Sequence, residues 1–423
     1  MLTAIVGINW GDEGKGRMVD LLSADYDIIC RYQGGNNAGH TVINDKGKFI
    51  LNLLPSGVFR DNAVNVMGGG MVIDIEHLCG EIKSLKDSGL ELSPKNLKIS
   101  DKAFICFPYH KQQDILEEER LKDKQYGSTR RGIAPVYGDK YMKKGLRMCD
   151  LLNPGTIKQK LLDILEWKTI ILSGYGGASY IEKNILLNWL LEFGKELQPY
   201  IIDTTNYLQK EVASGKKVMF EAQLGALRDI DYGIYPYTSS SQTLAAYAPI
   251  GAGLPGAQLD SVIGVMKAYS SCVGEGPFVV EMFGEEATAL REAGGEYGAA
   301  TSRPRRVGAF DVPASCYGVQ VQGAKEIALT KLDVLSYMEK IPVCVAYEID
   351  GVQTAEFTTG DALTKAKPVY EYLDGWQTDI SACRAKTELP AAALEYVRFI
   401  ENAVGCPISY VSVGADREQY VEF

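Results

Sequence analysis

The chain has 423 residues, of which 46% are hydrophobic and 23% charged, and its formal net charge is −10. This composition is that of an ordinary globular protein, so it excludes a disordered, fibrous or disulfide-framed small protein. The acidic balance argues against bulk nucleic acid or an anionic membrane as partner, so an anionic ligand must be held by a local cluster of cations.

The nine cysteines are spread singly along the chain, and none forms a C-x-x-C pair. That distribution predicts buried, reduced thiols. The N-terminus lacks the basic start and apolar stretch of a secretory signal, and no window approaches 18 apolar residues. We therefore expect a cytoplasmic protein without a membrane segment.

The first elements are predicted to be a strand, a loop and a helix. Residues 2–8 form a short apolar run, and residues 16–22 carry apolar side chains at helical spacing. Residues 26–32 predict a second strand, which leads into a second glycine-rich loop at residues 33–41.

Strands and helices then alternate along most of the chain. Asp74 is placed to cap a helix that ends before Gly89. Further strands are expected at residues 48–54, 64–67, 217–221, 261–268, 327–329, 341–347 and 408–413. Further helices are expected near residues 156–166, 182–194, 199–213 and 390–403.

This alternation predicts an α/β fold with a large, mostly parallel central sheet covered by helices. No fixed-period repeat, low-complexity tract or long linker separates independent units. We expect one elaborated α/β domain over residues 1–423, with inserted subdomains.

The segment WGDEGKGR at residues 10–17 lies between the first strand and the first helix. Its glycines let backbone N–H groups turn toward an anion, the following helix adds its positive end, and Lys15 adds a charge. It is not a Walker A motif, because Asn9 and Gly16 stand where glycine and Ser/Thr are required. Without that hydroxyl, Asp12 is the candidate ligand for Mg²⁺. The alternative is a surface turn that feeds a helix.

The second loop, QGGNNAGHT at residues 33–41, follows the second predicted strand. Ligands bind at the carboxyl edge of open α/β sheets, so this loop is a candidate site. Among the three histidines, His40 alone is embedded in glycine, whereas His77 and His110 are expected to be ordinary helix residues. A packed loop histidine is the alternative for His40.

Together, the two loops resemble those of the adenylosuccinate synthetase family, which joins aspartate to inosine monophosphate (IMP) with GTP and Mg²⁺. The resemblance continues in chain order through residues 54–57, 127–135, 235–237, 267–270, 298–306, 330–333 and 412–414. It implies a P-loop-like GTP-binding ligase fold and the first committed step from IMP to AMP in purine biosynthesis, by a homodimer with GTP as co-substrate.

The chemistry of the implied reaction gives the loop residues roles. A purine 6-oxo group has no leaving group, and phosphoryl transfer to O6 provides one. Asp12 fits as the base for the N1 proton, and the resemblance gives His40 the role of a hydrogen-bond donor to the γ-phosphoryl group. The resemblance adds Lys15 to the catalytic set, and Asp12 and Gly39 as Mg²⁺ ligands. The positions that match GTP-phosphate contacts are Gly14, Lys15, Gly16, Gly39, His40 and Thr41.

Guanine recognition is assigned by the resemblance to Lys331 and Asp333, with Ser412 and Gly414 near the same base. An aspartate accepts from both N1–H and N2–H₂ of guanine, a donor pair that adenine lacks. A lysine stem can cover the ring. These residues alone would otherwise indicate a strand that ends in a charged turn.

Aspartate carries two carboxylates, so its pocket should be cationic and suited to bidentate contacts. The arginine-rich segment at residues 298–306 fits, although a solvated basic run is the alternative. The resemblance implies aspartate contacts from Thr301, Arg303 and Arg305. It implies IMP contacts from Asp12, Asn37, Thr129, Arg131, Lys143, Gln223, Ser239 and Arg303.

Several positions differ from the family pattern, and two of them concern expected IMP contacts. Gln223 is displaced by one residue from the usual base-contacting glutamine, and Lys143 replaces an arginine that reaches the nucleotide phosphate across the dimer. Two other hypotheses remain. A regulatory GTP-binding switch would need no aspartate pocket, so Arg303 and Arg305 argue against it. A ligase for a 2-amino purine monophosphate stays open, although Asp12 favours the ordinary reaction.

Overall fold

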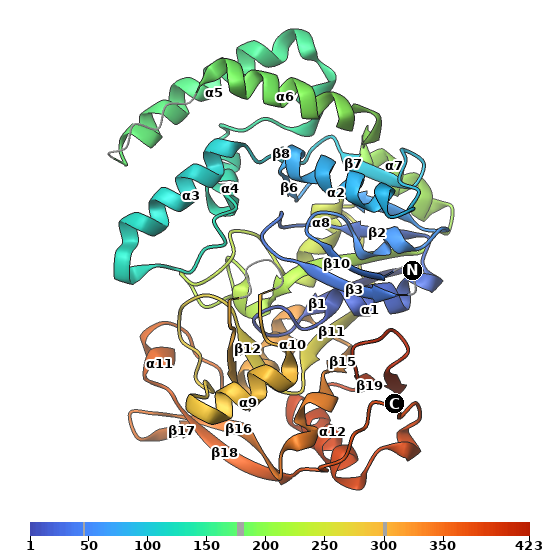
Figure 1. Cartoon of the computed structure of the whole chain (residues 1–423), viewed down its shortest axis with the longest axis vertical. Coiled ribbons are helices and arrows are strands. Elements are labelled where there is room, and N and C mark those ends of the chain that lie inside the picture. The colour runs from blue at the N-terminus through green and yellow to red at the C-terminus, as the bar shows by residue number, and fades with distance from the viewer. Residues whose placement is uncertain (45–46, 176–181, 299–302) are drawn as a thin grey trace.

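The computed structural model describes residues 1–44, 47–175, 182–298 and 303–423 (Figure 1). Its first half contains β1 (Leu2–Gly7), α1 (Lys15–Leu22), β2 (Ile28–Arg31), β3 (His40–Asn44), β4 (Gly47–Leu51), β5 (Val64–Met67), β6 (Val72–Ile73), α2 (Ile75–Asp87), β7 (Leu97–Ser100), β8 (Phe104–Ile105), α3 (Pro108–Leu121), α4 (Ile133–Tyr141), α5 (Pro154–Ser173), α6 (Lys183–Leu197), β9 (Ile201–Ile202) and α7 (Thr204–Ala213).

The second half contains β10 (Val218–Gly225), α8 (Ala248–Ala252), β11 (Ser261–Lys267), β12 (Ser270–Cys272), α9 (Gly284–Gly294), β13 (Arg306–Gly308), β14 (Phe310–Asp311), α10 (Val312–Gln322), β15 (Glu326–Thr330), β16 (Lys340–Ile349), β17 (Val352–Thr354), α11 (Gly360–Lys365), β18 (Lys367–Asp374), α12 (Ala391–Val404), β19 (Ile408–Ser412) and β20 (Tyr420–Glu422).

A large sheet forms the centre of the molecule. In the described part of the chain it has ten strands, in the order β20-β19-β15-β11-β1-β10-β2-β5-β7-β9, and only the β19–β20 pair is antiparallel. β1 lies in the middle and is buried along its whole length, which explains its continuous apolar run. The predicted fold class is confirmed.

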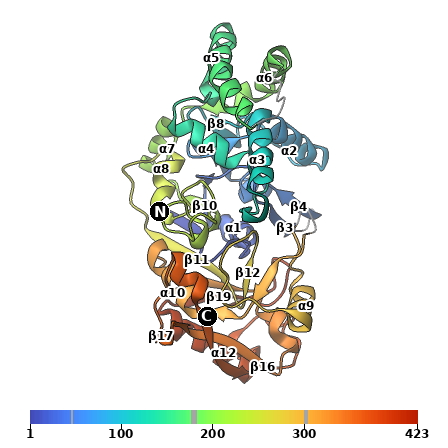
Figure 2. The same ribbon diagram turned by 90° about the vertical axis from the view of Figure 1, so that its left-hand side faces the viewer.

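Additional elements lie at the two ends of the long axis. α5 and α6 are at one end, and a second sheet with β16, β17 and β18 is at the other (Figure 1). The perpendicular view shows the same separation (Figure 2). None of the described helices has the length and apolar character needed to span a membrane. The central sheet lies between these two ends and carries the loops of the candidate site.

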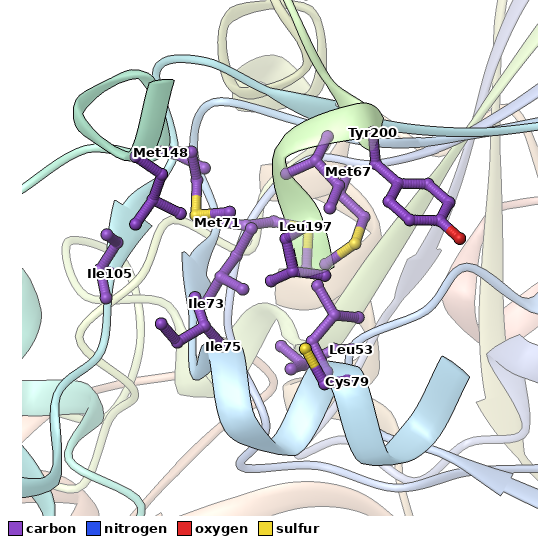
Figure 3. Packing of buried hydrophobic residues seen from close by; sticks show 14 of the residues in the cluster. Leu53, Met67, Met71, Ile73, Ile75, Cys79, Ile105, Met148, Leu197 and Tyr200 are labelled. Atoms are coloured by element: carbon purple, nitrogen blue, oxygen red, sulfur yellow. The ribbon is translucent and has the colours of Figure 1, made fainter. Parts of the chain in front are cut away.

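The hydrophobic core next to α2 joins the helical end to the sheet. It contains Met67 of β5, Ile75 and Cys79 of α2, and Leu197 of α6 (Figure 3). Burying each such side chain contributes roughly 1.5–3 kcal/mol. This packing fixes the helices against the side of the sheet that contains β5 and β7.

The expected α2 is confirmed together with its cap. The Asp74 side chain accepts from the backbone N–H of His77 at 3.2 Å. The nine cysteines are free thiols and six of them are buried. The helix expected near 390–403 is confirmed as α12.

Some expected elements differ from the structure. A continuous helix over 199–213 was wrong, because residues 201–202 form β9 and the Asp203 side chain caps a new helix at residue 204. The strand expected at 48–54 is β4, which ends at Leu51 and pairs with β3 outside the main sheet. The strand expected at 341–347 is part of β16 in the second sheet, and α5 extends to Ser173.

Candidate active site

The first glycine-rich loop lies between β1 and α1, as predicted, and a buried glutamate shapes it. Glu13 Oε1 accepts from the N–H groups of Asn9 at 3.1 Å and Gly11 at 2.7 Å. Its other oxygen, Oε2, lies 2.6 Å from Lys15 Nζ. Gly14 caps α1 with a φ of 96°, a conformation that favours glycine. Glu13 thus folds the loop and holds the lysine.

Asp12 sits at the turn of this loop, with a φ of 59°. Its side chain is 28% exposed, and its Oδ2 lies 3.2 Å from Arg305 Nη2. Asp12 lies just before the N-terminus of α1 and pairs with a guanidinium, so its carboxylate is placed to act as a base or as a metal ligand.

The second loop packs its histidine against the first turn of α1. A Cβ on Gly16 would lie 3.0 Å from the Cβ of His40, so glycine permits the approach. His40 Nδ1 lies 2.6 Å from Glu221 Oε1, and because a carboxylate only accepts, Nδ1 carries the proton. Glu221 also accepts from the N–H and hydroxyl of Ser56 at 2.7 and 2.6 Å.

The His40–Glu221 pair is buried, and burial disfavours the charged form of each side chain. Burial lowers the pKa of His40, while the hydrogen bond and charge of Glu221 act in the other direction. Burial also disfavours the charged form of Glu221, but His40 and Arg31 outweigh it and lower the pKa of Glu221. Glu221 therefore orients His40 and leaves Nε2 as the nitrogen that can meet a ligand.

The side chain of Gln223 braces the second loop. Its Oε1 accepts from the N–H of Gly35, and its Nε2 donates to the carbonyl of the same residue, both at 3.1 Å. A Cβ on Gly34 would lie 1.7 Å from Gln223 Oε1, which explains glycine there. Asn37, another expected IMP contact, accepts from the Gly35 N–H at 3.3 Å. The amide of Gln223 is thus engaged with the loop backbone.

A buried carboxylate, Glu296, brings three cations together. Its oxygens lie 2.6 Å from Lys267 Nζ, 2.7 Å from Arg305 Nη1 and 3.2 Å from Lys331 Nζ. Burial opposes its charge, but the three cations hold the pKa of Glu296 far below its usual range. Burial also lowers the pKa of Lys267 to about 8. Because Arg305 also reaches Asp12, a line of ion pairs joins the first loop to Lys331.

Lys331 and Asp333 follow β15, and Ser412 and Gly414 lie at the end of the neighbouring strand β19. Lys331 adopts the left-handed backbone conformation, with a φ of 60°, at the turn after β15. In the part of the chain that the structure describes, Asp333 Oδ1 is buried and has no hydrogen-bond partner. Burial raises the pKa of Asp333. A buried acceptor without a partner is costly, so this oxygen is placed for a ligand that donates.

Two carboxylates of α3 shape the loop at residues 126–132, which carries Thr129 and Arg131. Asp114 accepts from the Ser128 hydroxyl at 2.7 Å and the Gly132 N–H at 2.9 Å. Glu118 accepts from the N–H groups of residues 126 and 127, both at 3.2 Å. Thr129 is exposed at the surface of this loop.

The remaining expected residues are more dispersed. Arg303 Nη2 lies 3.3 Å from Glu275 Oε1 on the surface, and Thr301 falls outside the described residues. Ser239 Oγ lies 3.1 Å from Ser241 Oγ. Lys143 is exposed on the turn after α4, with a φ of 61°. Gly39 directly precedes β3, in which Thr41 pairs with residue 50 of β4.

Asp12 and Gly39 offer hard oxygen donors, a carboxylate and a backbone carbonyl. The described residues contain no group of three or more His, Cys, Asp or Glu side chains arranged for a metal. Mg²⁺ suits one or two protein oxygens when substrate phosphates and water complete its octahedron. The donor set therefore fits Mg²⁺ bound together with a nucleotide.

Four residues of the site were not given a role from the sequence: Arg17, Glu13, Glu221 and Glu296. The signal for Glu221 is a charged residue inside an apolar strand, which is costly unless the charge is paired. Glu296 gives no such local signal, since its partners lie at residues 267, 305 and 331. The two other histidines are outside the site: His77 contacts Asn52, and His110 contacts Asp139.

Comparisons with known proteins agree with the resemblance. A family model described as adenylosuccinate synthetase matches residues 4–421. The chain is 42% identical over 421 residues to adenylosuccinate synthetase of Caldanaerobacter subterraneus subsp. tengcongensis, covering 99% of this chain and 98% of that protein. It is 45% identical over 419 residues to adenylosuccinate synthetase 2 of Pseudoalteromonas translucida, with the same coverage of 99% and 98%.

Solved structures agree as well. The fully ligated adenylosuccinate synthetase from Plasmodium falciparum superposes with a TM-score of 0.94 at 37% identity, over 100% of this chain and 99% of that one. The cyanophage S-2L succinoaminodeoxyadenylate synthetase, bound to dGMP and dATP, superposes with a TM-score of 0.62 at 18% identity, over 100% and 95%. The second likeness concerns the fold alone.

Proposed function

The chain belongs to the adenylosuccinate synthetase family, and from that premise we propose which residues bind and activate the substrates. The family's reaction is the GTP-dependent ligation of L-aspartate to IMP in purine biosynthesis, and this chain is such a carbon–nitrogen ligase. The observation that best supports the residue roles is the line of ion pairs from Asp12 through Arg305 and Glu296 to Lys331. It connects the candidate sites for phosphoryl transfer, aspartate and guanine.

The reaction proceeds in two steps through 6-phosphoryl-IMP. Asp12 takes the N1 proton of IMP while O6 forms a bond to the γ-phosphorus and GDP leaves. The amine of aspartate then attacks C6, the C6–O6 bond breaks, and inorganic phosphate leaves with O6. The products are adenylosuccinate, GDP and phosphate.

His40 stabilises charge on the transferred phosphoryl group by donating a hydrogen bond from Nε2. Its contact with Glu221 supports this role, because the carboxylate favours the doubly protonated ring that such a donor requires and so opposes the burial that lowers the pKa of His40. Lys15, Gly14, Gly16 and Thr41 hold the phosphates of GTP at the start of α1. Bound at Asp12 and Gly39, Mg²⁺ would supply a Lewis acid that neutralises phosphate charge.

GTP is selected by Asp333, whose buried Oδ1 accepts from the N–H groups of guanine, with Ser412 and Gly414 beside the base. Lys331 covers the ring. The carboxylates of aspartate bind Arg303, Arg305 and Thr301. IMP is held by Asn37, Thr129, Arg131 and Ser239, together with Arg303 and Lys143, while Gln223 braces the loop that carries Asn37.

The active form is a cytoplasmic homodimer in which Lys143 reaches the partner's nucleotide. The turn that carries it supports an interface, since Tyr141 is 65% and Met142 49% exposed. Exposed aromatic and methionine side chains beside a cation are typical of protein–protein interfaces. The free cysteines are compatible with a reducing compartment.

One assay tests the substrate choice. Purified protein is incubated with aspartate, Mg²⁺, IMP or GMP, and GTP or ATP, while the absorbance change of the purine product is followed. We expect product from IMP with GTP and a much lower rate with ATP. Product from GMP in place of IMP would contradict the ordinary reaction, and equal rates with ATP and GTP would contradict the role of Asp333.

A further inference from the structure

One guanidinium of α1, that of Arg17, holds residues 412–419, here called the C-terminal loop. Arg17 Nη1 donates to Ser412 Oγ and to the carbonyl of Gly414, both at 2.5 Å. Its Nη2 donates to the carbonyls of Asp416 at 2.5 Å and Gln419 at 2.9 Å. Four contacts from one planar fork fix the path of the loop backbone.

The position of Arg17 along the chain links two parts of the nucleotide site. It lies two residues after Lys15, in the first turn of the helix that starts at the phosphate loop. Burial lowers the pKa of Arg17, and the nearby carboxylates of Asp333 and Asp416 act against this. The Arg17 guanidinium therefore interacts electrostatically with Asp333 and also binds the loop that carries Ser412 and Gly414.

Two other contacts of the loop show what Arg17 adds. Arg417 pairs with Asp20, one turn further along α1, at 2.7 Å. Within the loop, Gln419 Oε1 accepts from the Asp416 N–H at 2.9 Å. These contacts secure residues 416–419, whereas Arg17 also holds Ser412 and Gly414, next to β19.

We propose that Arg17 is a positioning residue for GTP, which ties the guanine-binding loop to the phosphate-binding helix. The proposal rests on the proposed function, because it requires that guanine bind at Asp333, Ser412 and Gly414. With the loop fixed to α1, the base and the triphosphate are bound at a constant separation. The base pocket is then too rigid to rearrange around adenine. In this role Arg17 acts through its hydrogen bonds to the loop, not on the reacting atoms.

The test is Arg17→Met, which keeps most of the stem and removes the fork. We expect KM for GTP to rise about tenfold or more and the GTP:ATP ratio of kcat/KM to fall about tenfold. KM for IMP and for aspartate should stay within about twofold. Arg17→Lys, with a point charge in place of the fork, should give an intermediate GTP:ATP ratio.

Arg60→Gln is the matched control. Arg60 donates to the Asp20 carbonyl at 2.6 Å and to Ser23 Oγ at 3.1 Å, at the other end of α1. It should leave the GTP:ATP ratio unchanged even if it lowers Tm. If it lowers the ratio as much as Arg17→Met does, the effect comes from helix stability and the proposal is wrong.

Asp333→Asn separates this proposal from the proposed function. A GTP:ATP ratio unchanged in Asp333→Asn would contradict guanine binding there. A ratio changed in Asp333→Asn but unchanged in Arg17→Met would overturn only the role of Arg17. If both variants lower the ratio, the double variant should lose less than the product of the two, because they act on one pocket. Full multiplicativity would show that Arg17 acts elsewhere.

Discussion

Several basic groups in the candidate site are held by buried carboxylates. Glu13 holds Lys15, Glu221 holds His40, and Glu296 holds Lys331 together with two further cations. Removing one partner of such a pair leaves an uncompensated buried charge, which costs about 3–5 kcal/mol. Pairing therefore keeps the cations ordered before an anionic substrate arrives.

Asp12 and His40 carry the chemical step in this account. Asp12→Asn and His40→Asn should each lower kcat by about a hundredfold or more, because both act on charge that develops during phosphoryl transfer. Steady-state kinetics with saturating GTP, IMP and aspartate measures this, and circular dichroism checks the fold. Near-normal turnover in a folded variant would remove that residue from the mechanism.

Glu221 orients His40, so its loss should affect turnover more than binding. Glu221→Gln should lower kcat about tenfold to a hundredfold while KM for aspartate changes little. Ser56→Ala is the matched control, since it removes one hydrogen bond to Glu221 but keeps the His40 contact. Equal losses in the two variants would show that Glu221 supports the fold and does not position the histidine.

Local sequence was sufficient to find His40 but not the partner that orients it. The glycines around His40 indicate a ligand loop, whereas Glu221 is 181 residues away along the chain. Its contact depends on β10 lying next to β2 in the sheet, and strand order cannot be derived from residue types alone. The role of Glu296 was not predicted for the same reason, because its partners are also distant along the chain or in another element.

At the scale of elements, a buried polar cluster joins α3, α4 and α5. His110 Nε2 of α3 lies 3.0 Å from Asp139 Oδ2 of α4, which lies 2.6 Å from Lys168 Nζ of α5. Lys168 Nζ is also over the ring of Tyr109, 5.3 Å from its centroid. One network of polar and charged side chains thus joins the three helices beside the loop at residues 126–132.

This cluster predicts a pH dependence of stability. Burial lowers the pKa of His110 from 6.5 to about 4, against the opposing effect of Asp139. Between pH 6.5 and 4 the unfolded chain therefore binds a proton at His110 that the folded chain does not. The contribution of His110 to the unfolding free energy is complete above pH 6.5 and decreases as the pH falls through this range. The shift corresponds to about 3 kcal/mol.

His110→Gln should flatten this dependence. Urea unfolding from pH 7.5 to 4 measures it, and the difference in unfolding free energy between wild type and variant should shrink as pH falls. Burial opposes the charge of Asp139, but His110 and Lys168 lower its pKa, so it stays ionised through the window. A difference that is constant with pH would show that His110 is not neutral in the folded protein.

Elements with clear local signals were predictable, and those defined by distant contacts were not. Asp74 and the periodic apolar face gave α2. The second sheet was missed because no residue of β18 is buried and its sequence lacks a continuous apolar run. β9 has only two residues and depends on pairing with Ile99 and Ser100.

At the scale of the whole molecule, the central sheet interleaves distant parts of the chain. β1 pairs with β10 and β11, and β19 and β20 close one edge. A sheet built from residues 2 to 422 leaves no simple cut between independent halves. We propose that residues 1–423 form one domain, in which both ends of the chain contribute strands to the same sheet.

The dimer prediction concerns Lys143. Lys143→Ala should raise KM for IMP about tenfold, because a charge-assisted hydrogen bond contributes about 1.5–3 kcal/mol. IMP should also favour association of wild-type chains, since in the proposed dimer each nucleotide contacts both chains. Kinetics and analytical ultracentrifugation with and without IMP test this. Unchanged KM together with an unchanged dissociation constant would make Lys143 an ordinary surface lysine.

The central claim is that O6 of IMP attacks the γ-phosphoryl group in the site formed by Asp12 and His40. The most direct test uses IMP labelled with ¹⁸O at O6, with GTP, Mg²⁺ and aspartate, and mass spectrometry of the phosphate released. Because the C6–O6 bond breaks after O6 has bonded to phosphorus, we predict one ¹⁸O in each inorganic phosphate. Unlabelled phosphate, formed together with adenylosuccinate, would contradict the account.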